Sequence, residues 1–288
     1  MREGNLEAPT RHPIDWKNPE FFDEGQAMAE MERVFDICHG CRRCVSLCQS
    51  FPTLFDLVDA TDDGEVHGVK KQAYWDVVDQ CYLCDLCYMT KCPYTPPHAW
   101  NLDFPHLMLR AKAIKFRKGE VGAKEQFLAS TDRHGQFAGI PIVVDIVNKV
   151  NGTQAARKLM DSQLGVHPDA WMPTLAPQRF RWGKALNNPA FTVVNGQRTP
   201  GKVAIYSTCY VNYNEPGIGN DLIKVLDHNQ IPWEIVEKEQ CCGMPKLELG
   251  DLAAVERAMQ ANIPVLAKYA REGWAIVSAI PSCTLMFK

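Results

Sequence analysis

Eight of the twelve cysteines lie in two short motifs between Cys38 and Cys92. The first motif reads Cys-x2-Cys-x2-Cys-x3-Cys, and the second reads Cys-x2-Cys-x2-Cys-x4-Cys-Pro. Their members, in chain order, are Cys38, Cys41, Cys44, Cys48, Cys81, Cys84, Cys87 and Cys92. Three cysteines at two-residue intervals can offer thiolates to three irons of one cubane, while a more distant cysteine supplies the fourth ligand. The motifs therefore predict two [4Fe–4S] clusters, and hence electron transfer.

In ferredoxins with two clusters, the fourth cysteine of each motif ligates the other cluster. The same crossing here assigns one cluster to Cys38, Cys41, Cys44 and Cys92, and the other to Cys81, Cys84, Cys87 and Cys48. Zinc is the alternative metal, but zinc sites usually combine two Cys-x2-Cys pairs and do not need a third cysteine at the same interval. Gln49 stands where a proline often follows the fourth cysteine, and four residues rather than three precede Cys92. These departures leave room for a looser loop or a changed cluster type at one site.

Four further cysteines follow short apolar runs in the last third of the chain. They are Cys209, the adjacent pair Cys241 and Cys242, and Cys283. Because the carboxyl ends of parallel strands lie at one edge of a sheet, we expect these four side chains to converge. Buried cysteines without a chemical role are the alternative, since free cysteine is often buried. The adjacent pair, followed by Gly243, favours a functional site that ligates metal or exchanges electrons.

Composition and charge narrow the class of protein. The net charge is −3, so no strong field favours nucleic acid. The N-terminus, Met1 to Glu7, lacks the apolar core of a secretory signal, so disulfides are a poor explanation for the cysteines. The longest uncharged stretch, Gly273 to Phe287, is shorter than the ~18–20 apolar residues of a spanning helix and contains Pro281. We expect a cytoplasmic location, which includes a peripheral position on the inner face of the cytoplasmic membrane.

The region before the cysteine-poor middle of the chain is predicted to be helical. Helix starts are indicated at Asn18-Pro19, at Phe51-Pro52 and at Asp103-Phe104-Pro105, and a further helix spans residues 69–78. The helix from Asp103 is expected to continue to about Arg117. These elements predict that residues 1–128 form an α-helical ferredoxin domain that carries both clusters.

The remaining chain divides into a connecting segment and a second domain. Residues 129–200 contain several prolines and a basic turn at Arg179 to Trp182, and they predict a connector with one or two helices. Residues 201–288 hold three apolar runs, alternating with two stretches of helical spacing. The runs are at 203–206, 233–236 and 274–279, and the helical stretches are at 221–226 and 252–270. This β-α-β-α-β order predicts a parallel sheet with helices packed on it, and the fold class of the chain is α plus α/β.

The cysteine segments of the second domain resemble a known family. Cys209 to Pro216, Cys241-Cys242-Gly243-Met244-Pro245 and Ser282-Cys283-Thr284 are similar to the cysteine-rich "CCG" domain of iron–sulfur proteins related to heterodisulfide reductase and to anaerobic glycerol-3-phosphate dehydrogenase. The N-terminal motifs resemble the helical ferredoxin module that precedes this domain in such proteins. The family pattern ends in Cys-x2-Cys, whereas Met286 stands at the last position here, which puts a complete non-cubane cluster in doubt. Since relatives carry a second such domain, we expect the chain to be truncated at its C-terminus.

The resemblance implies an electron-transfer subunit of a respiratory-type oxidoreductase. A flavoprotein dehydrogenase of the glycerol-3-phosphate or 2-hydroxy-acid type would be the partner, because no flavin or nicotinamide motif occurs in this sequence. Electrons would pass through the two clusters to a quinone, a membrane subunit or a thiol acceptor. The resemblance also allows a further iron–sulfur cluster in the CCG domain. Two alternatives stay open at this point. They are an autonomous heterodisulfide or thiol reductase that uses the Cys241-Cys242 region, and a non-catalytic redox sensor.

Overall fold

The computed structural model describes residues 9–135, 137, 139–181 and 201–287. The chain divides into two compact units, Met1–Val121 with Leu247–Leu252, and Gly122–Lys246 with Ala253–Lys288. The division into a ferredoxin domain, a connector and a CCG domain stays a prediction. Residues 182–200 of the predicted connector, including Trp182 of the basic turn, lie outside the described residues.

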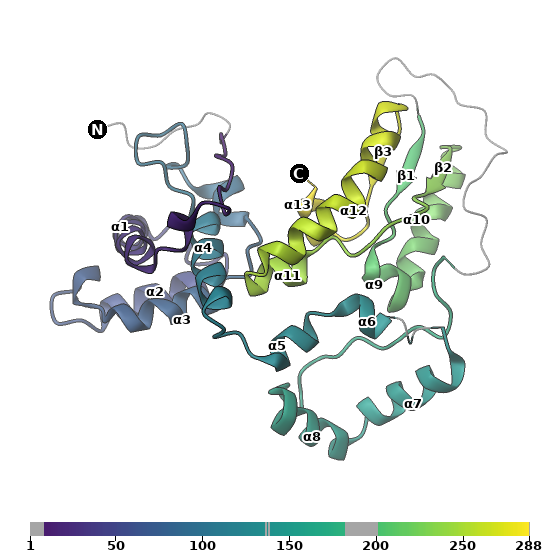
Figure 1. Cartoon of the computed structure of the whole chain (residues 1–288), viewed down its shortest axis with the longest axis horizontal. Coiled ribbons are helices and arrows are strands. Elements are labelled where there is room, and N and C mark those ends of the chain that lie inside the picture. The colour runs from purple at the N-terminus through teal and green to yellow at the C-terminus, as the bar shows by residue number, and fades with distance from the viewer. Residues whose placement is uncertain (1–8, 136, 138, 182–200, 288) are drawn as a thin grey trace. The chain divides into compact units, whose positions relative to one another are not determined.

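Helices and short turns make up the first unit (Figure 1). The α-helices are α1 (Glu24–Cys41), α2 (Ser50–Asp59), α3 (Tyr74–Asp79) and α4 (Phe104–Arg117). Three 3-10 turns (Pro19–Phe22, Val66–Gly68 and Lys71–Ala73) and a π turn (Cys87–Lys91) complete it. Aromatic rings join the helices, because the centroid of Phe51 lies 4.7 Å from that of Phe104, and Phe35 lies 5.0 Å from Tyr74. This core holds the ends of α1 and α3, from which the two cysteine motifs continue.

Predicted and observed helix starts agree at α4 and at α2, which begins at Ser50, so that the predicted start at Phe51-Pro52 lies in its first turn. Asp103 caps α4 by accepting a hydrogen bond from the backbone N–H of His106 at 3.0 Å, and the helix ends at Arg117 as predicted. Asn18 caps only a 3-10 turn, while α1 begins at Glu24 with Asp23 as its cap. The helix predicted over residues 69–78 is confirmed in part: it begins as a 3-10 turn at Lys71 and continues as α3. The chain at Val69 is extended and buried against the core, so the helix begins later.

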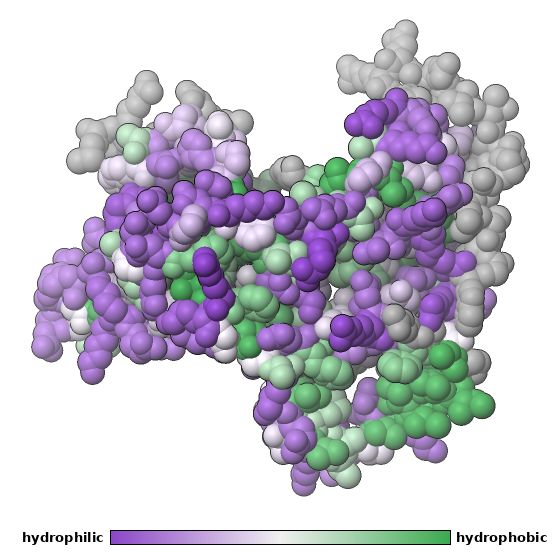
Figure 2. Space-filling view, viewed as in Figure 1, coloured by the Kyte–Doolittle hydropathy of each residue, from purple (hydrophilic) through white to green (hydrophobic). Residues whose placement is uncertain are grey.

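The segment after Val121 is more helical than predicted. It contains α5 (Ala123–Leu128), α6 (Thr131–Gly135), α7 (Pro141–Asn151) and α8 (Gln154–Leu164). Pro141 opens α7, since proline fits the first turn of a helix. An apolar patch covers α7 in Figure 2, where Ile142 is 75% exposed and Ile146 57% exposed. No helix among the described residues is long and apolar enough to cross a bilayer.

The predicted parallel sheet is present in the second unit. Its strands are β1 (Val203–Ile205), β2 (Trp233–Ile235) and β3 (Ala275–Val277), in the order β2-β1-β3. Both pairings are parallel, with Val203 opposite Trp233 on one side and opposite Ala275 on the other. The crossovers contain α10 (Pro216–His228) and α12 (Leu252–Arg271), as the sequence predicts. Three short helices were not predicted: α9 (Thr208–Tyr213), α11 (Met244–Leu249) and α13 (Pro281–Met286).

Candidate functional site

The structure gathers three cysteines of the first motif and one of the second around a single cavity. These are Cys38, Cys41, Cys44 and Cys92. Cys38 and Cys41 lie in the last turn of α1, and Arg42, with φ 50°, ends the helix and turns the chain toward Cys44. Ile37, Phe51, Phe55 and Leu102 line much of the remaining wall. The cavity is therefore walled by thiols and apolar side chains, and this donor set suits a cluster shielded from water.

The second triplet follows α3 and lies beside the end of the first motif. Cys81 is buried, Cys84 is exposed and Cys87 is half-buried. Positive φ values at Leu83 (52°) and Asp85 (61°) turn the chain twice between these cysteines. Cys48 is close enough that its charge acts on Cys81 and Cys87, and Cys87 also interacts with Cys44. The two groups of cysteines are thus adjacent, and each includes a member of the other motif.

Burial and mutual repulsion oppose thiolates in both groups. Burial is the main cause that raises the pKa of Cys38, and the charges of Cys92 and Cys44 add to it. Burial likewise raises the pKa of Cys44 and of Cys81 to about 11. Four neighbouring thiolates therefore need cations among them, and a metal deprotonates its thiol ligands outright. These residues fit an iron–sulfur cluster by the chemistry of their donors.

A site for one metal ion has different geometric needs. No group of three or more His, Cys, Asp or Glu side chains in residues 9–135, 137, 139–181 and 201–287 is arranged to hold a metal ion. In a cubane each thiolate binds its own iron, so its four sulfurs are spread around the cluster rather than around one point.

The four cysteines of the second unit lie together at the carboxyl edge of the sheet. Cys209 is the second residue of α9, Cys241 and Cys242 precede α11, and Cys283 is in the first turn of α13. The Sγ atoms of Cys242 and Cys283 are 3.2 Å apart. Cys241 is within hydrogen-bonding range of both Cys209 and Cys242. The short helices that the sequence did not predict are the elements that carry or follow these cysteines.

Hydrogen bonding favours negative charge on two sulfurs of this group. The hydrogen bond with Cys209 is the main cause that lowers the pKa of Cys241, and the hydrogen bond that Cys242 donates lowers the pKa of Cys283, while the pKa values of Cys209 and Cys242 are raised. Thr131 Oγ1 lies 3.6 Å from Cys241 Sγ. A thiolate is the form of cysteine that ligates metal or attacks a disulfide. The group is therefore prepared for either chemistry.

A polar cavity of about 310 Å³ opens beside Cys209 and Cys241. Asp132 on α6 and Arg181 also line it. The backbone N–H of Cys241 donates to Asp132 Oδ2 at 3.4 Å. Sequence reasoning missed Asp132 because it lies 109 residues from Cys241, and no local pattern connects the two.

Asn262 binds the backbone of the loop that carries the cysteine pair. This residue of α12 is 1% exposed, and its Nδ2 donates to the carbonyl oxygen of Cys241 at 3.2 Å. Its Oδ1 accepts a hydrogen bond from the backbone N–H of Gln240 at 2.9 Å. Asn262 also went unnoticed in the sequence, although it is a polar residue in the apolar stripe that contains Leu266 and Tyr269. A polar residue inside such a stripe is the signal that could have found it.

Asn262→Ala should lower the free energy of unfolding by about 1–3 kcal/mol, because it removes a buried side chain and leaves the part-buried N–H of Gln240 and carbonyl of Cys241 without this partner. Urea unfolding followed by circular dichroism measures this change. The matched control is Asn229→Ala, where the amide is exposed and bonds only to Val225 of its own helix. Equal effects of the two substitutions would contradict the role given to Asn262.

Comparisons with known proteins identify a cysteine-rich domain in this chain. The family model of the cysteine-rich domain CCG matches residues 203–288. A subunit of the anaerobic glycerol-3-phosphate dehydrogenase of Escherichia coli K12 is 25% identical over 259 residues, which cover 88% of this chain and 62% of that protein. The chain thus spans less than two thirds of that relative. No solved structure matches the chain.

Shorter similarities extend to other proteins. "Lactate utilization protein A" of Bacillus cereus is 32% identical over 86 residues, which are 30% of this chain and 34% of that protein. A subunit of the fumarate reductase (CoM/CoB) of Methanothermobacter marburgensis is 28% identical over 74 residues, 26% of this chain and 15% of that protein. The chain thus carries a CCG cysteine-rich domain at residues 203–288 and is similar along most of its length to this glycerol-3-phosphate dehydrogenase subunit.

Proposed function

We propose that this chain is the iron–sulfur electron-transfer subunit of a respiratory-type oxidoreductase. It would hold two [4Fe–4S] clusters and relay electrons from a flavoprotein dehydrogenase to a quinone or another acceptor. The names of two relatives, which place them in a glycerol-3-phosphate dehydrogenase and in a fumarate reductase, support the class of complex. The partner is of the glycerol-3-phosphate or 2-hydroxy-acid type in this proposal.

The observation that carries the proposal is the cavity where Cys92 of the second motif joins the triplet of the first. Local folding of either motif alone would not bring Cys92 to the cavity of the first triplet. One donor set therefore needs cysteines from both motifs, which lie between residues 38 and 92. The exchange of fourth cysteines between motifs is typical of proteins with two clusters. This arrangement supports the crossed assignment, with Cys48 completing the donor set of the second triplet.

The chain's own residues bind the clusters and set their surroundings. A bound [4Fe–4S] cluster accepts and releases one electron at a time. Phe51, Phe55 and Leu102 limit access of water to the first site, while Cys84 at the second site is exposed. Solvent exposure and hydrogen bonds to the sulfurs set cluster potentials. The two sites should therefore differ in potential, as a relay of electrons in one direction needs.

In this proposal, the cysteines of the second unit pass the electrons to the acceptor. They are placed to bind a further cluster or to exchange electrons as thiols, because the sulfurs of Cys242 and Cys283 are 3.2 Å apart and the hydrogen bond with Cys209 lowers the pKa of Cys241, which favours its thiolate. The same thiolate favours a second candidate function, an autonomous disulfide or thiol reductase. Affinity purification from the native host separates the two. A flavoprotein that co-purifies supports the relay, and disulfide reduction by the isolated chain supports the reductase.

Iron content tests the two-cluster proposal directly. Chain reconstituted without oxygen should contain about eight irons and eight acid-labile sulfides, four of each per cubane. A variant with serine at all four cysteines of the second unit is the control, and any iron above eight should disappear from it. Four irons or fewer after full reconstitution, or zinc in place of iron, would refute the proposal.

A further inference from the structure

Both cysteine motifs carry a charged residue at the same position. Arg42 follows Cys41, and Asp85 follows Cys84, each directly after the middle cysteine of its triplet. Both have positive φ values, 50° for Arg42 and 61° for Asp85. This conformation is uncommon for residues other than glycine and persists only where the surroundings hold it. Each turn therefore needs an anchor, and in both motifs the anchor is an ion pair between a guanidinium and a carboxylate.

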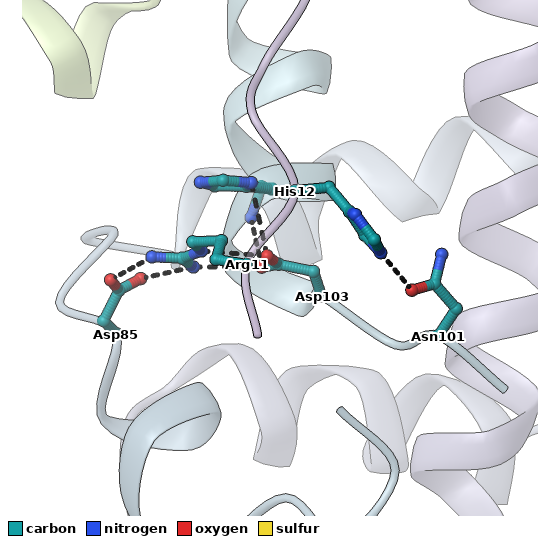
Figure 3. Close-up of polar contacts among 6 residues, drawn as sticks. Arg11, His12, Asp85, Asn101 and Asp103 are labelled. Carbon is teal, nitrogen blue, oxygen red and sulfur yellow. Dashed lines mark hydrogen bonds and ion pairs between the residues drawn. The ribbon is translucent and has the colours of Figure 1, made fainter. Parts of the chain in front are cut away.

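The anchor of the second motif comes from the N-terminal arm. Arg11 donates to both carboxylate oxygens of Asp85, at 2.5 Å and 3.0 Å, and to both oxygens of Asp103, at 2.9 Å and 3.0 Å (Figure 3). Asp85 lies between two cysteines of the triplet and is only 9% exposed, and Asp103 is the cap of α4. The Arg11 guanidinium also lies over the ring of Tyr88, 4.3 Å from its centroid. One side chain thus joins the cysteine loop to the start of α4.

Contacts on either side keep Arg11 in place. The backbone N–H of Thr10 donates to the carbonyl oxygen of Pro96 at 3.0 Å. His12 Nε2 lies 3.1 Å from Asn101 Oδ1, and Figure 3 shows the two side chains facing each other. Residues 10–12 therefore run across the segment that connects the second motif to α4. The arm is docked at three consecutive positions rather than by a single ion pair.

The anchor of the first motif is weaker. Arg42 pairs with Asp59 on α2, but their side chains are 40% and 52% exposed. The side chains of Arg11 and Asp85 are 28% and 11% exposed. Exposed pairs contribute little, whereas removing one partner of a buried pair leaves an uncompensated charge. The second motif is thus the one whose geometry depends on its ion pair.

We propose that Arg11 is a positioning residue for the second cluster site, formed by Cys81, Cys84, Cys87 and Cys48. Its guanidinium holds the loop of Asp85 in the turn that presents these cysteines, and it balances two carboxylates beside the site. The inference rests on the proposed two-cluster function. It adds a residue from outside both motifs to that function, and it assigns the effect of that residue to one of the two clusters.

The test compares Arg11→Met with Arg33→Met. The control removes the same group from a two-pronged ion pair with Glu30 on α1, where both side chains are about 40% exposed, and from one hydrogen bond to the carbonyl oxygen of Trp100. In Arg11→Met, an iron chelator should remove one cluster about tenfold faster than in the unaltered chain, since several charge-assisted bonds are lost. The midpoint potential of that cluster should become more negative, because two carboxylates stay beside it without their cation. The other cluster and the control should be unchanged.

Two further variants test the geometry rather than the fold. Arg11→Lys keeps the charge but cannot reach two carboxylates with a planar fork, so its chelation rate should lie between those of Arg11→Met and the unaltered chain. Asp85→Asn keeps a residue that tolerates positive φ. The double variant Arg11→Met with Asp85→Asn should lose its cluster to the chelator no faster than the more affected single variant, because both substitutions remove the same contact. Effects that simply add would overturn the proposal.

Hydrogen exchange in the iron-free chain gives a readout that needs no cluster. Amides of residues 81–92 should exchange faster in Arg11→Met than in Arg33→Met, while those of residues 38–48 should not differ. Equal changes in both segments, or none, would overturn the role of Arg11. Fewer than two clusters in the unaltered chain would instead count against the proposed function, and the exchange experiment would still decide the role of Arg11.

Discussion

Cys242→Ser is expected to abolish electron delivery to the natural acceptor while both N-terminal clusters stay reducible by dithionite. Cys242 is 6% exposed, and its sulfur touches that of Cys283 at 3.2 Å. A serine hydroxyl is neither a soft metal ligand nor able to form a disulfide, so either chemistry of the group is lost. The eight N-terminal cysteines belong to the other compact unit, so their clusters should survive the change.

Turnover of the complete complex with a quinone acceptor measures this effect. The matched control is Thr284→Ala, which removes an exposed hydroxyl next to Cys283 that bonds only to Ile280 of the same turn. Thr284→Ala should turn over normally. Unimpaired turnover of Cys242→Ser would mean that the cysteine pair is structural and that the N-terminal clusters alone carry the function.

Cys92→Ser is expected to damage the cluster of the first triplet rather than that of its own motif. Cys92 lines the cavity with Cys38, Cys41 and Cys44, so its loss removes a ligand from that site. The iron content should fall by about four per chain if that cluster is released. Paramagnetic resonance of the reduced variant identifies which signal is lost.

Cys48→Ser is the matched partner of this experiment. It should damage the signal of the second triplet and spare the first, because the charge of Cys48 acts on Cys81 and Cys87. If each substitution changed only the signal of its own motif, the crossed assignment would be wrong. The pair of variants therefore distinguishes crossed from uncrossed ligation without knowledge of either potential.

Local patterns were sufficient to predict much of the second unit. Val203, Trp233 and Ala275 begin strands within the apolar runs identified in the sequence, and α12 begins at Leu252 as predicted. Strongly apolar runs and a long amphipathic helix can be recognised in the sequence, because the spacing of their apolar residues reflects the face that they bury. At α4, Asp103 and Pro105 mark the start in the sequence because both act within the first turn.

The short helices behind the cysteines could not be predicted in this way. α9, α11 and α13 have six residues each, too few for helical spacing to appear. A helix of this length is unstable alone, because its first turn costs more than its few hydrogen bonds return. α9, for example, packs against α10 and α6, so contacts distant in sequence accompany it. The start of α1 was mispredicted for another reason. Asn18 and Asp23 are both favourable cap residues, and the local sequence does not show which of them begins the α-helix.

The residues around the sites depend on contacts distant in sequence. Arg11 is 74 residues from Asp85 and 92 from Asp103, and no motif links them. The cysteine spacing predicts the donors because neighbouring ligands must wrap one cluster. It contains no information on which side chain from elsewhere in the fold steadies the loop between them.

The opposite charges of Arg42 and Asp85 disfavour mispairing of the motifs while the chain folds. The two triplets have the same spacing, so spacing alone does not prevent the N-terminal arm from docking on the wrong one. Docking on the first motif would bring Arg11 against Arg42, and docking of Asp59 on the second would bring it against Asp85. Like charges penalise both errors, and wrong partners are excluded by such repulsion as much as right ones are chosen by attraction. The charges therefore favour the pairing of each motif with its own partner.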